Sequence, residues 1–87
     1  MNPDDVLHGS PDLVVEVKSP SSTEEQLREV VSYGLNNGAM EVWIVEGGRK
    51  SVTVFRPDGI PAVFNVGDNL SLAAFGGGEL AVNEIFG

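Results

Sequence analysis

Three segments in the first half of the chain follow one another as strand, helix and strand. Residues 12–18 and 41–46 are rich in valine, and residues 22–35 between them carry apolar side chains at three- and four-residue spacing. A crossover helix of this length between two strands predicts a βαβ unit, with parallel strands and a right-handed connection. This succession restricts the chain to a mixed α/β fold.

The helix has recognisable signals at both ends. Ser22 is the predicted N-cap, with Glu25 completing a capping box from the third helical position. Asn36-Asn37-Gly38 ends the helix, with Gly38 as a left-handed cap. One buried stripe is expected, made of Leu27, Val30, Val31, Leu35 and either Tyr33 or Gly34.

The second half reads as strands joined by tight turns. Residues 51–56 alternate between two faces, Pro57-Asp58-Gly59 is a strong turn signal, and residues 61–66 complete an antiparallel meander. Leu70 and Leu72 predict a further short strand, and residues 80–86 form either a short helix or an apolar tail. The expected fold is a small mixed sheet with one principal helix on one face.

Length and composition set the broad class. With 87 residues the chain is expected to form one small domain over residues 11–87, preceded by an irregular segment over residues 1–10. It has no cysteine, which excludes disulfides and thiolate zinc sites. No apolar run has the length of a membrane span and no signal peptide opens the chain, so a cytoplasmic protein without a membrane partner is expected.

The charge of the chain is strongly acidic. Five basic residues against thirteen acidic ones give a net charge of −8. Nucleic-acid binders normally carry a basic patch, because neutralising phosphates supplies much of their affinity. Binding to DNA would therefore need a divalent cation, parts outside this chain, or a local basic spot. Arg49, Lys50 and Arg56 form the one basic spot in the sequence; it either keeps the hairpin soluble or contacts a DNA backbone.

The strand over residues 12–18 carries charged side chains on one of its two faces. Because alternate side chains of a strand point to opposite faces, Asp12, Glu16 and Lys18 share a face with Val14. Burying such charges is costly unless they pair or hold an ion. The set suits metal-assisted hydrolysis, since carboxylates bind a hard cation and a lysine steadies a developing anion. An ordinary ion pair between Glu16 and Lys18 on an edge strand is the simpler alternative.

Several motifs together resemble one enzyme family. The sequence PDLVVEVKSPS, then LREVVSYGLNNGAMEVWIVEGGRKSVTVFRPDG, and the closing pattern Leu-x-Val-x-Glu-Ile-Phe are similar to the Uma-type restriction endonucleases of the PD-(D/E)XK nuclease superfamily. The resemblance implies an endonuclease-like core fragment, the C-terminal part of the family fold. It also implies phosphodiester hydrolysis with Mg²⁺ or Mn²⁺ and contact with DNA through the metal site. Glu16 and Lys18 match the family's catalytic (D/E)xK element, with Glu16 as metal ligand and Asp12 or another carboxylate beside it.

Two departures from the family pattern bear on activity. An aspartate that normally lies upstream has no counterpart unless Asp4, Asp5 or Asp12 replaces it. Asp12 is expected to lie about 13 Å from Glu16 in a regular strand, too far for both carboxylates to hold one ion. In addition, Glu29 stands where many relatives have a lysine. A catalytically inactive oligomerisation or binding module that retains the nuclease fold is therefore the alternative function.

The predicted sheet also suggests self-association. Valine-rich strands such as residues 12–18 and 41–46 are normally covered on both faces and paired on both edges. A single helix covers one face only. The sequence therefore predicts a homo-oligomer, most simply a homodimer formed by edge pairing or by burial of the open face.

Overall fold

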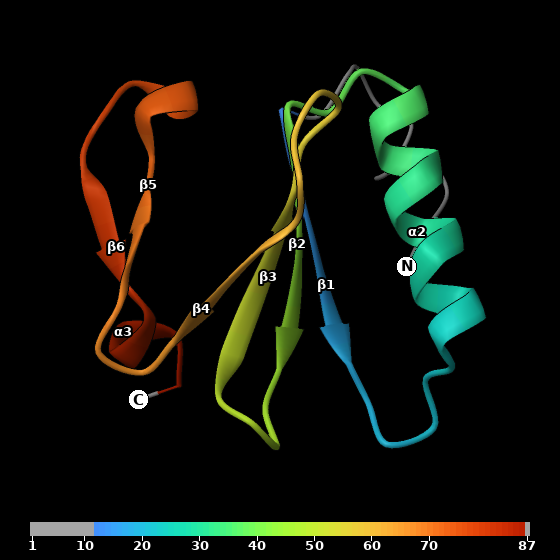
Figure 1. Ribbon diagram of the computed structural model, residues 1–87, viewed down its shortest axis with the longest axis horizontal. Coiled ribbons are helices and arrows are strands. Elements are labelled where there is room, and N and C mark those ends of the chain that lie inside the picture. The colour runs from blue at the N-terminus through green and yellow to red at the C-terminus, as the bar shows by residue number, and fades with distance from the viewer. Residues whose placement is uncertain (1–11, 87) are drawn as a thin grey trace.

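A computed structural model describes residues 12–86, so the predicted irregular segment 1–10, with Asp4 and Asp5, lies outside the described residues. The central element is a four-stranded sheet in the order β1-β2-β3-β4, with helix α2 on one side and a C-terminal segment on the other (Figure 1). The elements of the sheet layer and its helix are β1 (Leu13–Lys18), α2 (Glu24–Asn36), β2 (Glu41–Glu46), β3 (Ser51–Phe55) and β4 (Ala62–Asn65). The C-terminal segment contains β5 (Asn69–Ser71), the 3-10 helix η1 (Ala73–Phe75), β6 (Glu79–Ala81) and α3 (Val82–Phe86).

The sheet confirms the predicted mixed topology. Strands β1 and β2 are parallel, with Leu13 beside Glu41 and Lys18 beside Glu46. Strands β2, β3 and β4 are successively antiparallel. The βαβ unit and the meander are therefore both present, and the chain has the mixed α/β fold that the sequence predicts.

Helix α2 begins one residue later than predicted. Thr23 is the N-cap, and its side chain accepts a hydrogen bond from the backbone N–H of Gln26 at 3.1 Å, while the Gln26 side chain accepts one from the Thr23 N–H. Ser22 is instead used by the preceding turn, where its hydroxyl accepts a hydrogen bond from the backbone N–H of Ser19. The helix ends at Asn36 as expected, with Gly38 at a φ of 94°.

Helix α2 packs against one face of the sheet at very short range. A Cβ atom on Gly34 would lie 2.8 Å from Cγ2 of Val42, which is fully buried. Gly34, not Tyr33, therefore belongs to the buried stripe; Tyr33 is 45% exposed. The cluster beneath the helix consists of Ala39, Val42 and Ile44, with Val14, Leu27, Val31, Leu35 and Phe55 packed against it.

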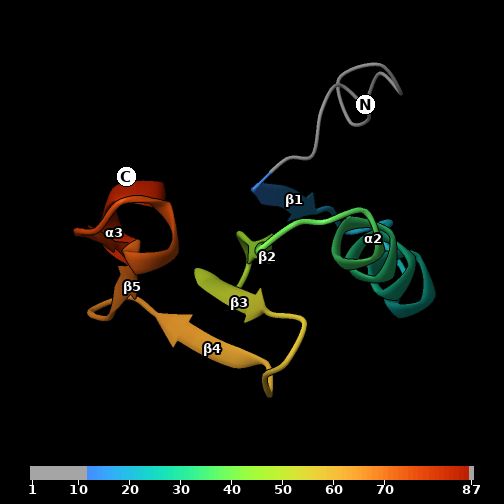
Figure 2. The ribbon, with the colours of Figure 1, turned by 90° about the horizontal axis from the view of Figure 1, so that it is seen from above.

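The opposite face of the sheet is covered by the chain's own C-terminal segment. Figure 2, seen from above, places β5 and α3 across the sheet from α2. Leu70 of β5 and Val82 of α3 are buried against Trp43 and Val52. This corrects the expectation of an open face, because the short elements after residue 66 supply a second covering layer.

Both edge strands of the sheet, β1 and β4, pair with a single neighbour within the described part of the chain. On β1, the Val15 and Val17 side chains are 48% and 65% exposed. Homo-oligomer formation therefore stays a prediction, which now concerns these two edges and the part of the face around Val15 and Val17. None of the helices within residues 12–86 is long and apolar enough to cross a membrane.

Candidate active site

The predicted catalytic pair lies on the helix-covered side of β1. Glu16 and Lys18 are both half-buried, whereas Val15 and Val17 on the other side of the strand are exposed. The parallel register places Glu16 beside Ile44 and Lys18 beside Glu46. The two side chains thus point to the same face, as the strand periodicity predicts.

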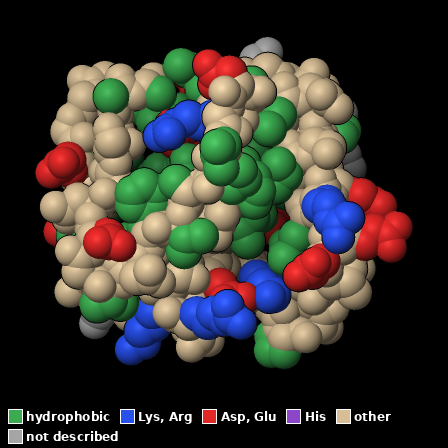
Figure 3. Space-filling view, viewed as in Figure 1, with side chains coloured by type: hydrophobic (Ala, Val, Ile, Leu, Met, Phe, Trp, Pro, Cys, Tyr) green, Lys and Arg blue, Asp and Glu red, His purple; other side chains and the backbone are tan. Residues whose placement is uncertain are grey.

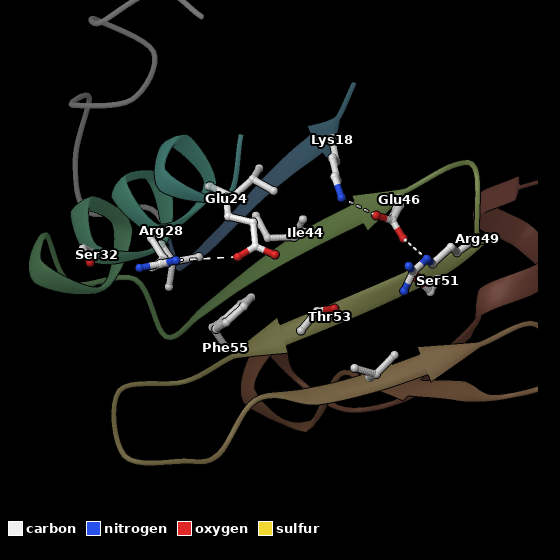
Figure 4. A pocket seen from close by; sticks show the side chains of 13 residues that line it. Lys18, Glu24, Arg28, Ser32, Ile44, Glu46, Arg49, Ser51, Thr53 and Phe55 are labelled. Carbon is white, nitrogen blue, oxygen red and sulfur yellow. Dashed lines mark hydrogen bonds and ion pairs between the residues drawn. The ribbon is translucent and has the colours of Figure 1, made fainter. Parts of the chain in front are cut away.

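Lys18 is the centre of a small charge network at the end of the parallel strands. Its ammonium donates to Oε1 of Glu46 at 2.6 Å, and Nε of Arg49 lies 3.3 Å from Oε2 of the same carboxylate (Figure 4). The hydrogen bond from Lys18, aided by the charges of Lys18 and Arg49, lowers the pKa of Glu46 against a weaker opposing effect of burial. Lys18 therefore pairs across the two strands with Glu46 and not with Glu16.

The lowered pKa of Glu46 predicts a pH-dependent contribution to stability. A carboxyl whose pKa is depressed on folding stabilises the fold above its ordinary value of 4.5, and this contribution disappears as the pH falls through the folded value. The difference in free energy of unfolding between the native chain and Glu46→Gln should therefore shrink as the pH drops below 4.5. Denaturant unfolding of both proteins at several pH values measures it. A difference that stays constant across this range would contradict the assignment.

Glu16 and Asp12, the predicted metal ligands, differ in their surroundings. The Glu16 carboxylate is half-buried, and no hydrogen bond or ion pair to it is found among residues 12–86. Asp12 is exposed just before β1, and its backbone carbonyl accepts hydrogen bonds from the N–H groups of Met40 and Glu41. Within the described residues, no three His, Cys, Asp or Glu side chains gather closely enough to hold a metal ion. Glu16 is thus the one carboxylate on β1, and no partner among residues 12–86 engages it.

Lys18 also lines a groove between α2 and the sheet. The groove has a volume of about 450 Å³ and is walled by α2 on one side and floored by strands β2, β3 and β4. Glu46 and Arg49 lie with Lys18 at one end, and Arg28 of α2 pairs with Glu24 at 3.6 Å along the wall (Figure 4). The predicted catalytic lysine therefore stands at the end of a concave surface large enough for a small ligand.

Several residues of this site escaped the sequence analysis. Glu46 reads as the polar end of a buried strand, and only the parallel register brings it to Lys18. The predicted basic spot is divided in space: Arg49 joins the groove, while Arg56 pairs at 2.9 Å with Glu41. Arg28 was assigned no role from the sequence. One signal in the sequence could have revealed the pairing of Lys18 with Glu46. Each residue is the last of a predicted strand, and parallel strands in register place their last residues side by side.

The comparisons with known proteins agree with this architecture. The sequence profile of the Uma2 family, described as "putative restriction endonuclease", matches residues 3–83. The chain belongs to the Uma2 family. Among curated proteins, none matches this Uma2 chain significantly.

A solved structure shows the same fold. It is described as "a putative nuclease belonging to DUF820" from Anabaena variabilis ATCC 29413, and it is 20% identical in sequence with a TM-score of 0.77. The match covers 90% of this Uma2 chain and 45% of the other protein, so the chain spans less than half the length of that relative. This likeness shows that the chain has the same fold as part of that protein.

Proposed function

We propose that this Uma2 chain takes part in Mg²⁺-dependent phosphodiester hydrolysis of the PD-(D/E)XK kind, with Glu16 and Lys18 in the reaction centre. Family membership supports a nuclease reaction. The observation that carries the assignment to these residues is their shared position. Both are half-buried on the helix-covered face of β1, and Lys18 stands at the end of the groove.

The residues present are compatible with magnesium. Mg²⁺ usually keeps several waters and is held by one or two carboxylates together with substrate phosphates. Glu16 offers one carboxylate that is unengaged within residues 12–86. Asp12, the second ligand predicted from the sequence, lies about 13 Å away along the strand and would not share one ion with Glu16, so waters and phosphate oxygens would complete the shell. When bound, the ion would supply Lewis acidity to the scissile phosphate.

The chain's own side chains would act in defined ways. The Lys18 ammonium would donate to a phosphate oxygen and stabilise the negative charge that develops there. Glu46 would position that ammonium, because it already accepts its hydrogen bond at 2.6 Å. Arg49, bound to the other oxygen of Glu46, would hold the carboxylate in this orientation.

A second function, a non-catalytic binding or oligomerisation module, is favoured by one specific observation. Lys18 is already paired with Glu46, and the part of the chain that the structure describes gathers no three acidic or imidazole side chains for a metal. A complete metal site normally needs its full ligand set. In this alternative the same face of β1 would contact a ligand without cleaving it.

A cleavage assay separates the two functions. Supercoiled plasmid and single-stranded DNA are incubated with the chain in Mg²⁺ or Mn²⁺, and in parallel with EDTA. Nicking or degradation that requires the cation supports the nuclease. Binding of DNA with no cleavage in either cation supports the module.

A further inference from the structure

The groove carries a disproportionate share of the chain's positive charge. Three of the five basic residues line it, namely Lys18, Arg28 and Arg49, but only two of the eleven acidic residues within residues 12–86 do, namely Glu24 and Glu46. The lining thus carries one net positive charge on a chain whose net charge is −8. An anionic ligand meets less repulsion here than over the rest of the surface.

The floor of the same groove is apolar and partly open. Ile44, Phe55 and Val63 line it, and Val63 is 59% exposed. In the space-filling view, hydrophobic side chains gather in the middle of the face, with Lys and Arg side chains along its lower rim (Figure 3). An aromatic and aliphatic floor beside cationic side chains is the surface on which proteins stack nucleic-acid bases while holding the phosphates.

The charged and apolar parts lie at opposite ends of one strand. Ser51, at the start of β3, is beside Glu46, and Phe55 is at its other end. Ser51 and Phe55 are about 13 Å apart along β3. Lys18 and Arg49 flank the first end, and the Phe55 ring lies toward the second (Figure 4). A single nucleic-acid chain can therefore place a phosphate at the Lys18 end of the groove and a base at the Phe55 end at the same time.

We propose that this groove binds an unpaired base of a single-stranded nucleic acid, with the neighbouring phosphates at Lys18 and Arg49. The inference rests on the proposed nuclease function and specifies its substrate class. In a duplex each base is stacked between its neighbours, so its flat face cannot reach Phe55. An unpaired base presents that face freely, which makes single strands or unpaired segments the preferred ligand.

Binding of short oligonucleotides tests the proposal. Fluorescence anisotropy is measured with labelled oligo(dT), with the same strand carrying abasic sites, with oligo(U), and with a duplex of equal length, all in EDTA to prevent cleavage. Oligo(dT) should bind at least about tenfold more tightly than the abasic strand or the duplex, since stacking of a base is worth roughly this factor or more. Oligo(U) binding similarly would extend the ligand class to RNA. Equal affinity for the abasic strand and oligo(dT) would overturn the proposal.

Two neighbouring basic residues provide a matched control. Arg49 lines the groove and Lys50 does not, although both are exposed at the β2–β3 turn. Arg49→Gln should weaken oligo(dT) binding about threefold to tenfold, and Lys50→Gln by less than about twofold, although each removes one positive charge. Equal losses would indicate general attraction between charges and would contradict a groove site.

The base contact has its own variant. Phe55→Leu keeps an apolar side chain in the cluster beneath α2 but removes the ring, so oligo(dT) should bind no better than the abasic strand. A thermal unfolding curve close to that of the native chain shows that the variant is folded. Persistence of the base preference in this folded variant would overturn the assignment of Phe55.

The outcomes distinguish this inference from the proposed function. Base-dependent binding in EDTA without cleavage in Mg²⁺ or Mn²⁺ would support the groove and overturn the nuclease. Metal-dependent cleavage of duplex plasmid with no preference for unpaired strands would support the nuclease and overturn the groove.

Discussion

Replacement of Glu16 with glutamine should reduce metal-dependent DNA cleavage by at least about 100-fold. The amide has nearly the same shape as the carboxylate but lacks the negative charge that a hard cation requires. Substitution of a residue that only hydrogen-bonds to a metal ligand already lowers metal affinity or activity by about 10- to 100-fold. Loss of the ligand itself should lower the cleavage rate at least as much. Cleavage rates of plasmid and single-stranded DNA, measured over a series of Mg²⁺ and Mn²⁺ concentrations, give the effect.

The matched control for this variant is Glu79→Gln. Glu79 is exposed on β6, in the layer on the far side of the sheet, and its substitution changes the net charge by the same amount. Its cleavage rate should stay within about twofold of that of the native chain, because exposed charges far from the site are largely screened. Comparable losses in both variants would show that net charge, and not a ligand at Glu16, determines activity.

Lys18→Met gives the second half of the same prediction. Methionine is unbranched like lysine and has no charge, so cleavage should fall by about 100- to 1,000-fold, the usual cost of removing one donor to a developing anion. Stability should change little, because the Lys18 and Glu46 side chains are 35% and 22% exposed and partly solvated ion pairs contribute weakly. A cleavage rate equal to that of the native chain would assign Lys18 to the ion pair alone.

The strand and helix pattern of this chain could be predicted because local signals and tertiary contacts agree. Valine-rich segments 12–18 and 41–46 became β1 and β2, and the turn at Pro57-Asp58-Gly59 separates β3 from β4. The prediction of the first residue of α2 was wrong by one position, because two neighbouring residues can both cap the helix. Thr23 and Ser22 are both good N-caps, and the choice depends on the hydrogen bond that Ser22 makes to Ser19.

The covering of the second face could not be predicted, because it depends on packing between distant residues. Leu70 and Leu80 pair across β5 and β6. Each of these strands has only three residues, and their sequences show little intrinsic preference for the extended conformation. The connection between them contains η1 and then Gly76, Gly77 and Gly78, all with φ above 90°. Three consecutive glycines in a sequence indicate only a flexible joint, whereas the packing of this hairpin onto Trp43 and Val52 depends on tertiary contacts.

The candidate site shows the same division between local and tertiary information. That Glu16 and Lys18 face the same way follows from strand periodicity alone. That Lys18 meets Glu46 requires the parallel register, and that Arg28 and Phe55 border the same groove requires the position of α2 over the sheet. The candidate residues of a site can therefore be identified from the sequence of one strand. The side chains that pair with them can be identified only when the neighbouring elements are placed.

Glu41 is a charged residue at the start of the buried strand β2. Its side chain is 3% exposed, on the face opposite α2. One carboxylate oxygen accepts a hydrogen bond from Nε1 of Trp43 at 2.8 Å, and the other accepts one from Nε of Arg56 at 2.9 Å. Both oxygens thus have partners, which is the condition for tolerating a buried charge.

Glu41→Leu should lower the free energy of unfolding by about 2–4 kcal/mol, since the indole N–H of Trp43 would be left buried without an acceptor. Arg56 is 44% exposed and can be solvated by water, so it adds less to this cost. Arg56→Met should be destabilising for a different reason, because it leaves the Glu41 carboxylate buried without its cation. Denaturant unfolding of both single variants and of the double variant measures these effects. The double variant should lose clearly less than the sum of the single losses, because both act on one network; strict additivity would show that Glu41 and Arg56 stabilise the fold independently.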